Sequence, residues 1–145
     1  MKRTGIFGII YPIPNSILNG ALATGKNIFI KNPVHETLPL YLSKGSKILF
    51  YVGKPDKKII AEGTIRSIEL LDFISIIRKG YSKKLMQPRD VLQEYCGTEF
   101  MSGLRRKLVF HIEKLKYLKR KIMPKFPITM TGKYINKSEY LTLVK

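Results

Sequence analysis

The chain has 145 residues, enough for a single domain that buries a core without disulfides or bound metal, and we expect one domain over 1–145. Lys and Arg number 27 against 10 Asp and Glu, which gives a formal net charge of +17. Such an imbalance favours binding to a polyanion, with nucleic acid ahead of an anionic membrane surface. A compositional bias towards Lys would supply part of the charge without any function.

Cysteine and histidine are too scarce for common structural sites. Cys96 is the only cysteine, which excludes an internal disulfide and a zinc site built on a cysteine pair. His35 and His111 are the only histidines and lie far apart in sequence. We therefore predict no metal and no cofactor, and a reducing cytoplasmic location fits this composition.

The N-terminus imitates a signal peptide. Lys2 and Arg3 precede an apolar stretch, and 21–23 resembles a cleavage site. Pro12 and Pro14 interrupt the stretch early, however, and the elements that cleavage would remove are ones the domain needs. No later stretch is long enough to cross a bilayer, so no membrane partner is expected.

The first part of the chain predicts a strand, a helix and a second strand. A β-branched and aromatic run over 6–13 predicts a strand. Asn15 or Ser16 is expected to cap a helix that Gly25 ends. A short strand over 27–31 would direct Ile28 and Ile30 to one side, and Phe29 and Lys31 to the other. The stretch 34–45 shows no clear period.

The clearest pattern is a hairpin. Runs over 47–52 and 58–68 alternate in polarity and are joined by turn residues at 53–57. Gly63 in the second run indicates a bulge or a bend at a barrel corner. The apolar stretch 70–77 is expected to be buried as either helix or strand, and 88–95 is expected to form a short helix.

The stretch 104–122 admits two interpretations. Apolar residues recur at helical spacing, which would give a basic amphipathic helix. Over 107–112, however, the residues alternate and are rich in β-branched and aromatic types, and we therefore predict a long strand. A strand over 128–131, a turn at Gly132 and a helical turn from Ser138 complete the chain. The whole indicates an α+β fold with a mainly antiparallel, barrel-like sheet and flanking helices.

Three stretches in this order resemble the PUA-like superfamily, which includes the PUA, ASCH, EVE and YTH domains. They are 25–31, similar to the strand of ASCH domains that begins Gly-x-Lys; 45–51, a strand entry ending in Tyr; and 60–65, similar to a Gly-Glu-Gly-x-Ile strand. The resemblance covers roughly the first half of the chain and looks like an archaeal branch. It implies a small β-barrel whose rim holds RNA, a modified base or a nucleotide-like ligand.

We therefore expect an RNA-binding domain, with transfer or ribosomal RNA as the partner. Cations would bind phosphates, and flat aromatic rings would stack on unpaired bases. The densest charge lies over 105–125, where Glu113 is the only acid. The expected phosphate contacts are Lys31, Lys54, Arg105, Arg106, Lys107 and Lys133. The expected stacking residues are Phe29, Tyr51 and Tyr134, and for Phe29 a place in the core is an equal alternative.

Two other functions remain open. Some ASCH-type proteins resemble hydrolases of a modified nucleoside that use a Lys and a Thr of the Gly-x-Lys strand. Lys26 matches that Lys, but Phe29 stands at the Thr position and Lys31 at an Arg position, so no catalytic residue is predicted. Thr24 lies outside the pattern. The other alternative is a basic structural protein of a ribonucleoprotein.

Overall fold

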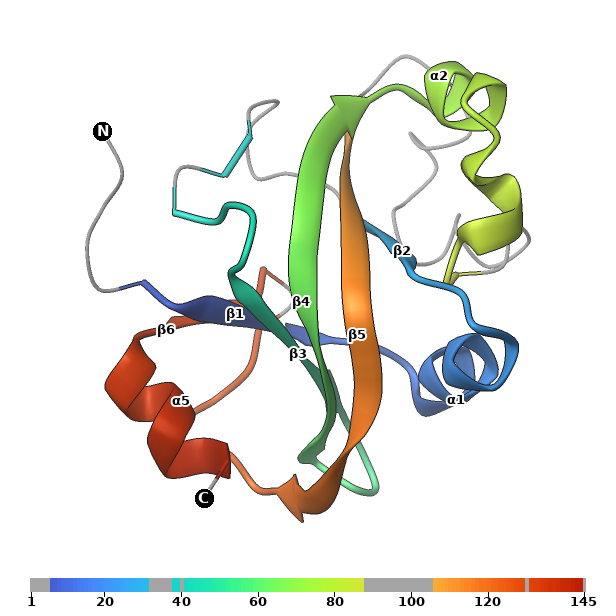
Figure 1. Ribbon diagram of the computed structural model, residues 1–145. Helices are drawn as coiled ribbons and strands as arrows, with labels where there is room; N and C mark the ends of the chain where they lie inside the picture. The colour runs from blue at the N-terminus through green and yellow to red at the C-terminus, as the bar shows by residue number, and fades with distance from the viewer. Residues whose placement is uncertain (1–5, 32–37, 40, 88–105, 130, 145) are drawn as a thin grey trace.

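The computed structural model describes residues 6–31, 38–39, 41–87, 106–129 and 131–144 (Figure 1). Its strands are β1 (Gly8–Pro12), β2 (Ile28–Lys31), β3 (Lys47–Val52), β4 (Lys58–Leu71), β5 (Lys107–Ile122) and β6 (Lys133–Ile135). Its helices are α1 (Asn15–Thr24), α2 (Phe73–Arg78), the 3-10 turn η1 (Tyr81–Lys84) and α5 (Lys137–Val144). The chain therefore has the predicted α+β composition.

The strands form one six-stranded mixed sheet in the order β2-β5-β4-β3-β1-β6. Only β1 and β3 pair in parallel, and every other neighbouring pair in this sheet is antiparallel. The predicted hairpin of β3 and β4 is confirmed. The stretch 104–122 contains a strand and no helix in its described part, because the alternation of Leu108, Phe110 and Ile112 buries one face in the core.

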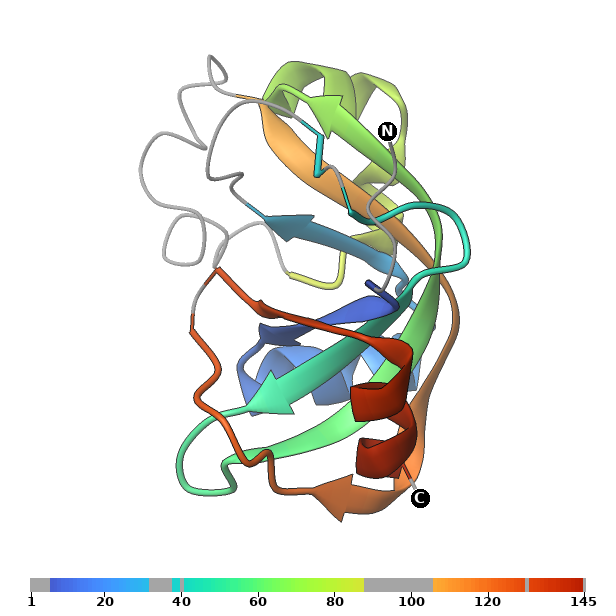
Figure 2. The same ribbon diagram turned by 90° about the vertical axis from the view of Figure 1, so that its left-hand side faces the viewer.

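The sheet curls, and its concave face encloses the main core. Tyr11 on β1 lies 5.6 Å from Phe29 on β2 and 5.6 Å from Phe110 on β5, measured between ring centroids. Phe29 also lies 5.1 Å from Phe50 on β3. Rings from strands far apart in the sheet order meet only if the sheet bends round on itself, as Figure 2 shows for the long β4 and β5. Helix α1 adds Leu18 and Ala21 to this core.

Two smaller apolar layers cover the outer face. Ile28 and Ile30 of β2 share one side as predicted, and this side is the outer face, where they pack with Phe73 and Ile76 of α2. At the other end, Ile10, Leu49, Ile59 and Ile135 form a layer that receives Tyr140 and Leu143 of α5. Helix α5 thus lies beside the C-terminal half of β5 (Figure 2).

The structure decides three local predictions, which concern the starts of α1 and α2 and the position of the last strand. Asn15 and Ser16 lie inside α1, whose cap residue is Pro14, so the predicted side-chain cap is wrong. The stretch 70–77 divides into the end of β4 and α2, and the Asp72 carboxylate caps α2 by accepting from the Ser75 backbone N–H at 2.7 Å. No strand is present in the described part of 128–131; the strand follows Gly132 instead, where Lys133–Ile135 pairs with β1.

The predicted bulge at Gly63 is present, since the pairing of β4 with β5 shifts register between Glu62 and Thr64. The predicted helix over 88–95 lies outside the described residues.

Candidate nucleic-acid interface

Two of the predicted residues, Lys31 and Tyr134, lie close to the buried ring of Tyr11. The Lys31 ammonium lies 5.5 Å from the centre of the Tyr11 ring. Both side chains are buried, and burial, followed by the proximity of Tyr134, raises the pKa of the Tyr11 phenol. The phenol therefore stays neutral, and the Lys31 cation faces a ring rather than a phenolate.

The rings of Tyr134 and Tyr41 extend this group of residues around Tyr11. Their rings meet edge to face at 5.5 Å, and Tyr134 packs on the main core while remaining partly exposed. Gly132 lies against Tyr11: a Cβ there would stand 2.8 Å from the ring, so only glycine lets this turn approach so closely. Tyr11 and Tyr41 were not predicted from the sequence, because nothing local indicates that their strand and loop meet Tyr134.

The other predicted stacking residues differ in exposure. Phe29 is fully buried and belongs to the aromatic core, which was the alternative left open by the sequence. Tyr51 is half-buried and packs against the outer layer that also receives α5, whereas Tyr11 belongs to the main core. The structure therefore does not bring Phe29, Tyr51 and Tyr134 together on one surface.

The residues predicted to contact phosphate also lie in different parts of the fold and differ in exposure. Lys54 is exposed in the β3–β4 turn, and Arg106 is exposed at the start of β5. Lys107 is only 1% exposed, so its ammonium does not project into solvent. Lys133 is half-buried, with its ammonium 5.4 Å from the centre of the Phe126 ring. Arg105 lies outside the described residues.

The C-terminal half of β5 and the residues after it carry the densest exposed charge. Strand β2 pairs with β5 only as far as His111, so beyond it this half of β5 has no partner on that side within the described sheet. Its cations are all exposed, and none forms an ion pair with a described residue. These residues, here called the basic edge, are Lys114, Lys116, Lys119, Arg120, Lys121 and Lys125.

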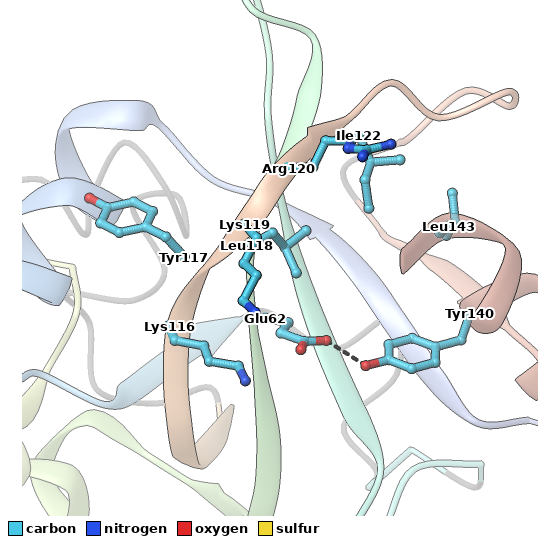
Figure 3. Close-up of a pocket in the computed structure, with 9 residues that line it drawn as sticks. All are labelled: Glu62, Lys116, Tyr117, Leu118, Lys119, Arg120, Ile122, Tyr140 and Leu143. Carbon is cyan, nitrogen blue, oxygen red and sulfur yellow. Dashed lines mark hydrogen bonds between the residues drawn. The ribbon is translucent and has the colours of Figure 1, made fainter. Parts of the chain in front are cut away.

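A pocket of about 510 Å³ opens between the basic edge and α5 (Figure 3). Leu118, Ile122 and Leu143 contribute apolar surface to it, and Lys116, Lys119 and Arg120 add positive charge. The Tyr140 hydroxyl donates to Glu62 Oε2 at 2.7 Å across the same pocket. No local sequence pattern indicates this pair, whose members are 78 positions apart.

A second polar cluster surrounds Glu69 on the outer face. The Tyr81 hydroxyl donates to Glu69 Oε1 at 2.5 Å, and His111 Nε2 contacts the same oxygen at 2.6 Å. Lys79 lies 3.4 Å from the other carboxylate oxygen. Burial and the hydrogen bond to Glu69 raise the pKa of Tyr81 to about 12. The His111 ring is buried, and its contact with Glu69 fixes the position of Nε2.

The hydrolase alternative gains no geometric support from Thr24. Its hydroxyl donates to the Gly20 carbonyl oxygen at 2.7 Å within α1. Thr24 and Lys26 line one shallow pocket of about 350 Å³ together with apolar helix residues. A nucleophile needs a base within hydrogen-bond reach, and neither a carboxylate nor a histidine lines this pocket among the residues described.

Within the described ranges, no three His, Cys, Asp or Glu side chains gather in a way that would hold a metal ion. In the same part of the chain, every helix is too short or too polar to cross a membrane.

The fold is similar to that of proteins whose structures have been solved. Similar solved structures include the ASCH protein from Zymomonas mobilis (TM-score 0.70, 12% identity, 93% of this chain and 92% of that one) and two mutant forms of it. The mutant forms give TM-scores of 0.73 and 0.74 at 12% identity, with 94% and 95% of this chain and 95% and 94% of theirs covered. At this identity the likeness shows the fold, and it agrees with the resemblance to PUA-like domains.

No curated protein matches the chain. The model of the family described as Domain of unknown function (DUF365) matches residues 6–137. The chain therefore belongs to the DUF365 family, and its fold is similar to that of ASCH domains.

Proposed function

We propose that this protein binds RNA along the basic edge. The observation that carries the proposal is the exposure of six cations on and just after a half-strand that β4 pairs on one side only, with no ion pair from these cations to a described carboxylate. Cations held in this way exchange counterions for phosphates, and the release of those counterions drives association.

Lysines on an edge strand also have a structural role, because they discourage pairing with a second sheet. Two features favour nucleic acid beyond that role. The positive charge continues past the end of β5 to Lys125, and Tyr117, 49% exposed, lies within the run. An exposed ring among cations suits stacking on an unpaired base. This favours single-stranded or looped RNA over a regular duplex.

The test is fluorescence anisotropy with labelled transfer RNA, single-stranded RNA and duplex DNA at low and near-physiological salt. The variant Lys121→Gln/Lys125→Gln removes two cations of the basic edge. The matched control Lys83→Gln/Lys84→Gln removes two exposed lysines from η1. We expect the first variant to reduce the salt slope by about 1.4, at about 0.7 per lost contact to a single strand, while the control keeps the slope.

Equal losses in the two variants would show that net charge alone attracts RNA, and would contradict the proposal. Equal binding of RNA and duplex DNA that disappears at the higher salt would contradict it as well.

A further inference from the structure

The pocket between β5 and α5 has the composition of a site for a flat, anionic ligand. Its volume of about 510 Å³ lies within the range of about 300–1,000 Å³ that is usual for small-molecule sites. Leu118 and Ile122 approach from the strand and Leu143 from the helix. In Figure 3 Leu118 lies on the strand side and Leu143 on the helix side, with Ile122 between them in this view. Apolar surfaces placed in this way would hold a ring between them.

One carboxylate lies in this largely positive pocket. Glu62 is 9% exposed, and the Tyr140 hydroxyl is the hydrogen-bond partner of its Oε2. Burial, and then the hydrogen bond to and the charge of Glu62, raise the pKa of Tyr140, so this phenol remains a donor. Glu62 Oε1 has no hydrogen-bond partner among the described residues, although it belongs to a group that lines the pocket. A ligand with N–H groups would supply that partner.

The positive groups lie beside this carboxylate. Lys116 is directly opposite Glu62 in the pairing of β4 with β5, and no ion pair joins them. Lys119 and Arg120 complete the set of cations that line the pocket (Figure 3). Three cations against one carboxylate leave the pocket net positive. The chemistry that fits is a ring with hydrogen-bond donors on one edge and a phosphate attached.

We infer that this pocket binds a guanine nucleotide, with the base between Leu118 and Leu143 and its donor edge on Glu62. Guanine presents two adjacent donors on its Watson–Crick edge, the N1–H and the 2-amino group, which suit the two oxygens of one carboxylate. Adenine, cytosine and uracil each present one donor group there. The phosphate would lie against the cations of the pocket. The inference rests on the proposed RNA binding, which it deepens by naming the base.

The test distinguishes recognition of the base from attraction of the phosphate. The full chain is titrated calorimetrically with GMP and with IMP, which carries the same phosphate and lacks only the 2-amino group. Losing one hydrogen bond to a charged acceptor costs about tenfold in affinity, so GMP should bind about ten times more tightly than IMP. Glu62→Gln should bring the ratio to about one. Glu113→Gln, the matched control, removes the same charge from an exposed position on β5 and should keep the ratio.

A second variant guards against a folding defect in Glu62→Gln. Leu143→Ala removes one apolar wall on α5 without altering Glu62, so both nucleotides should bind more weakly while their ratio stays the same. A ratio near one in the unmodified protein would overturn the inference. A ratio that Glu113→Gln and Glu62→Gln change equally would overturn it too.

A further arm compares octamers of uridine with and without one central guanosine. Tighter binding of the guanosine octamer identifies RNA as the source of the nucleotide. A preference for GMP in a protein that binds no RNA would retain the pocket assignment and contradict the proposed function. Salt-dependent RNA binding without preference for guanine in either arm would overturn the inference and leave the proposed function intact.

Discussion

The rings of Tyr11 and Phe29 lie 5.6 Å apart, although β5, β4 and β3 separate their strands in the sheet. This contact ties the two sides of the curled sheet together across its interior. Phe29 is fully buried and also meets the rings of Phe50 and Phe110. The position is therefore central to the stability of the fold rather than to contact with a ligand.

Phe29→Ala should lower the free energy of unfolding by about 3–5 kcal/mol, because it removes a ring from the core and leaves a cavity. Urea denaturation at neutral pH measures this difference. Tyr51→Ala, at a half-buried position, should cost less. A loss below about 1 kcal/mol for Phe29→Ala would contradict the core assignment and restore Phe29 as a stacking residue.

Gly63 is required by a close approach of two strands. A Cβ at this position would stand 2.4 Å from Cγ2 of Ile112, inside van der Waals contact. Gly63→Ala should therefore destabilise the protein by about 1–3 kcal/mol, as overpacking does. Gly20 gives the matched comparison, since a Cβ there meets nothing within 4 Å and the residue lies in α1. Gly20→Ala should stabilise by about 0.5–1 kcal/mol, and thermal unfolding of the pair would show opposite shifts.

Glu69 should make the stability depend on pH in the acid range. Burial alone would raise the pKa of its carboxyl, but the hydrogen bonds from Tyr81 and His111, with the charges of His111 and Lys79, lower it below its ordinary 4.5. A lowered folded-state pKa stabilises the protein above the unfolded value, and this stabilisation is lost as the pH falls through the folded value. Stability should thus decline below about pH 4.5.

Glu69→Gln should cost about 1–3 kcal/mol at pH 7, where the carboxylate is a charged acceptor. The difference from the unmodified protein should shrink below pH 4.5, when the native carboxyl itself takes up a proton. Urea midpoints between pH 7 and pH 3 measure both effects. A constant difference across this range would mean that the variant acts through packing rather than through charge.

Local sequence patterns correctly predicted those elements in which neighbours in sequence are also neighbours in the fold. The β3–β4 hairpin was predicted because its turn residues and its alternation agree, and both lie within one short stretch. Strand β5 was predicted because Leu108, Phe110 and Ile112 show a strand period next to the helical one. The predicted strand over 128–131 was wrong because the backbone of 133–135 pairs with β1, and such distant pairing has no local signal.

The site was less predictable than the fold for the same reason. Glu62 and Tyr140 are brought together by the packing of α5 on the outer layer, which a pattern of charges does not reveal. Lys107 illustrates the opposite error: a basic run predicted a solvated cation, yet this side chain is only 1% exposed. Composition therefore predicted a polyanionic partner, and only the packing separates buried from accessible cations.

For the proposed RNA binding, we expect Tyr134, which packs near Tyr11, to provide a second contact through stacking. Tyr134→Leu removes the aromatic face, and binding of single-stranded RNA should weaken by about 1–3 kcal/mol, the usual cost of losing one stacked base. The salt slope should stay unchanged, because no phosphate contact is lost. Tyr134→Phe keeps the ring and should keep the affinity. If Tyr134→Leu leaves anisotropy titrations unaltered at both salt concentrations, RNA does not contact Tyr134 and the basic edge alone accounts for binding.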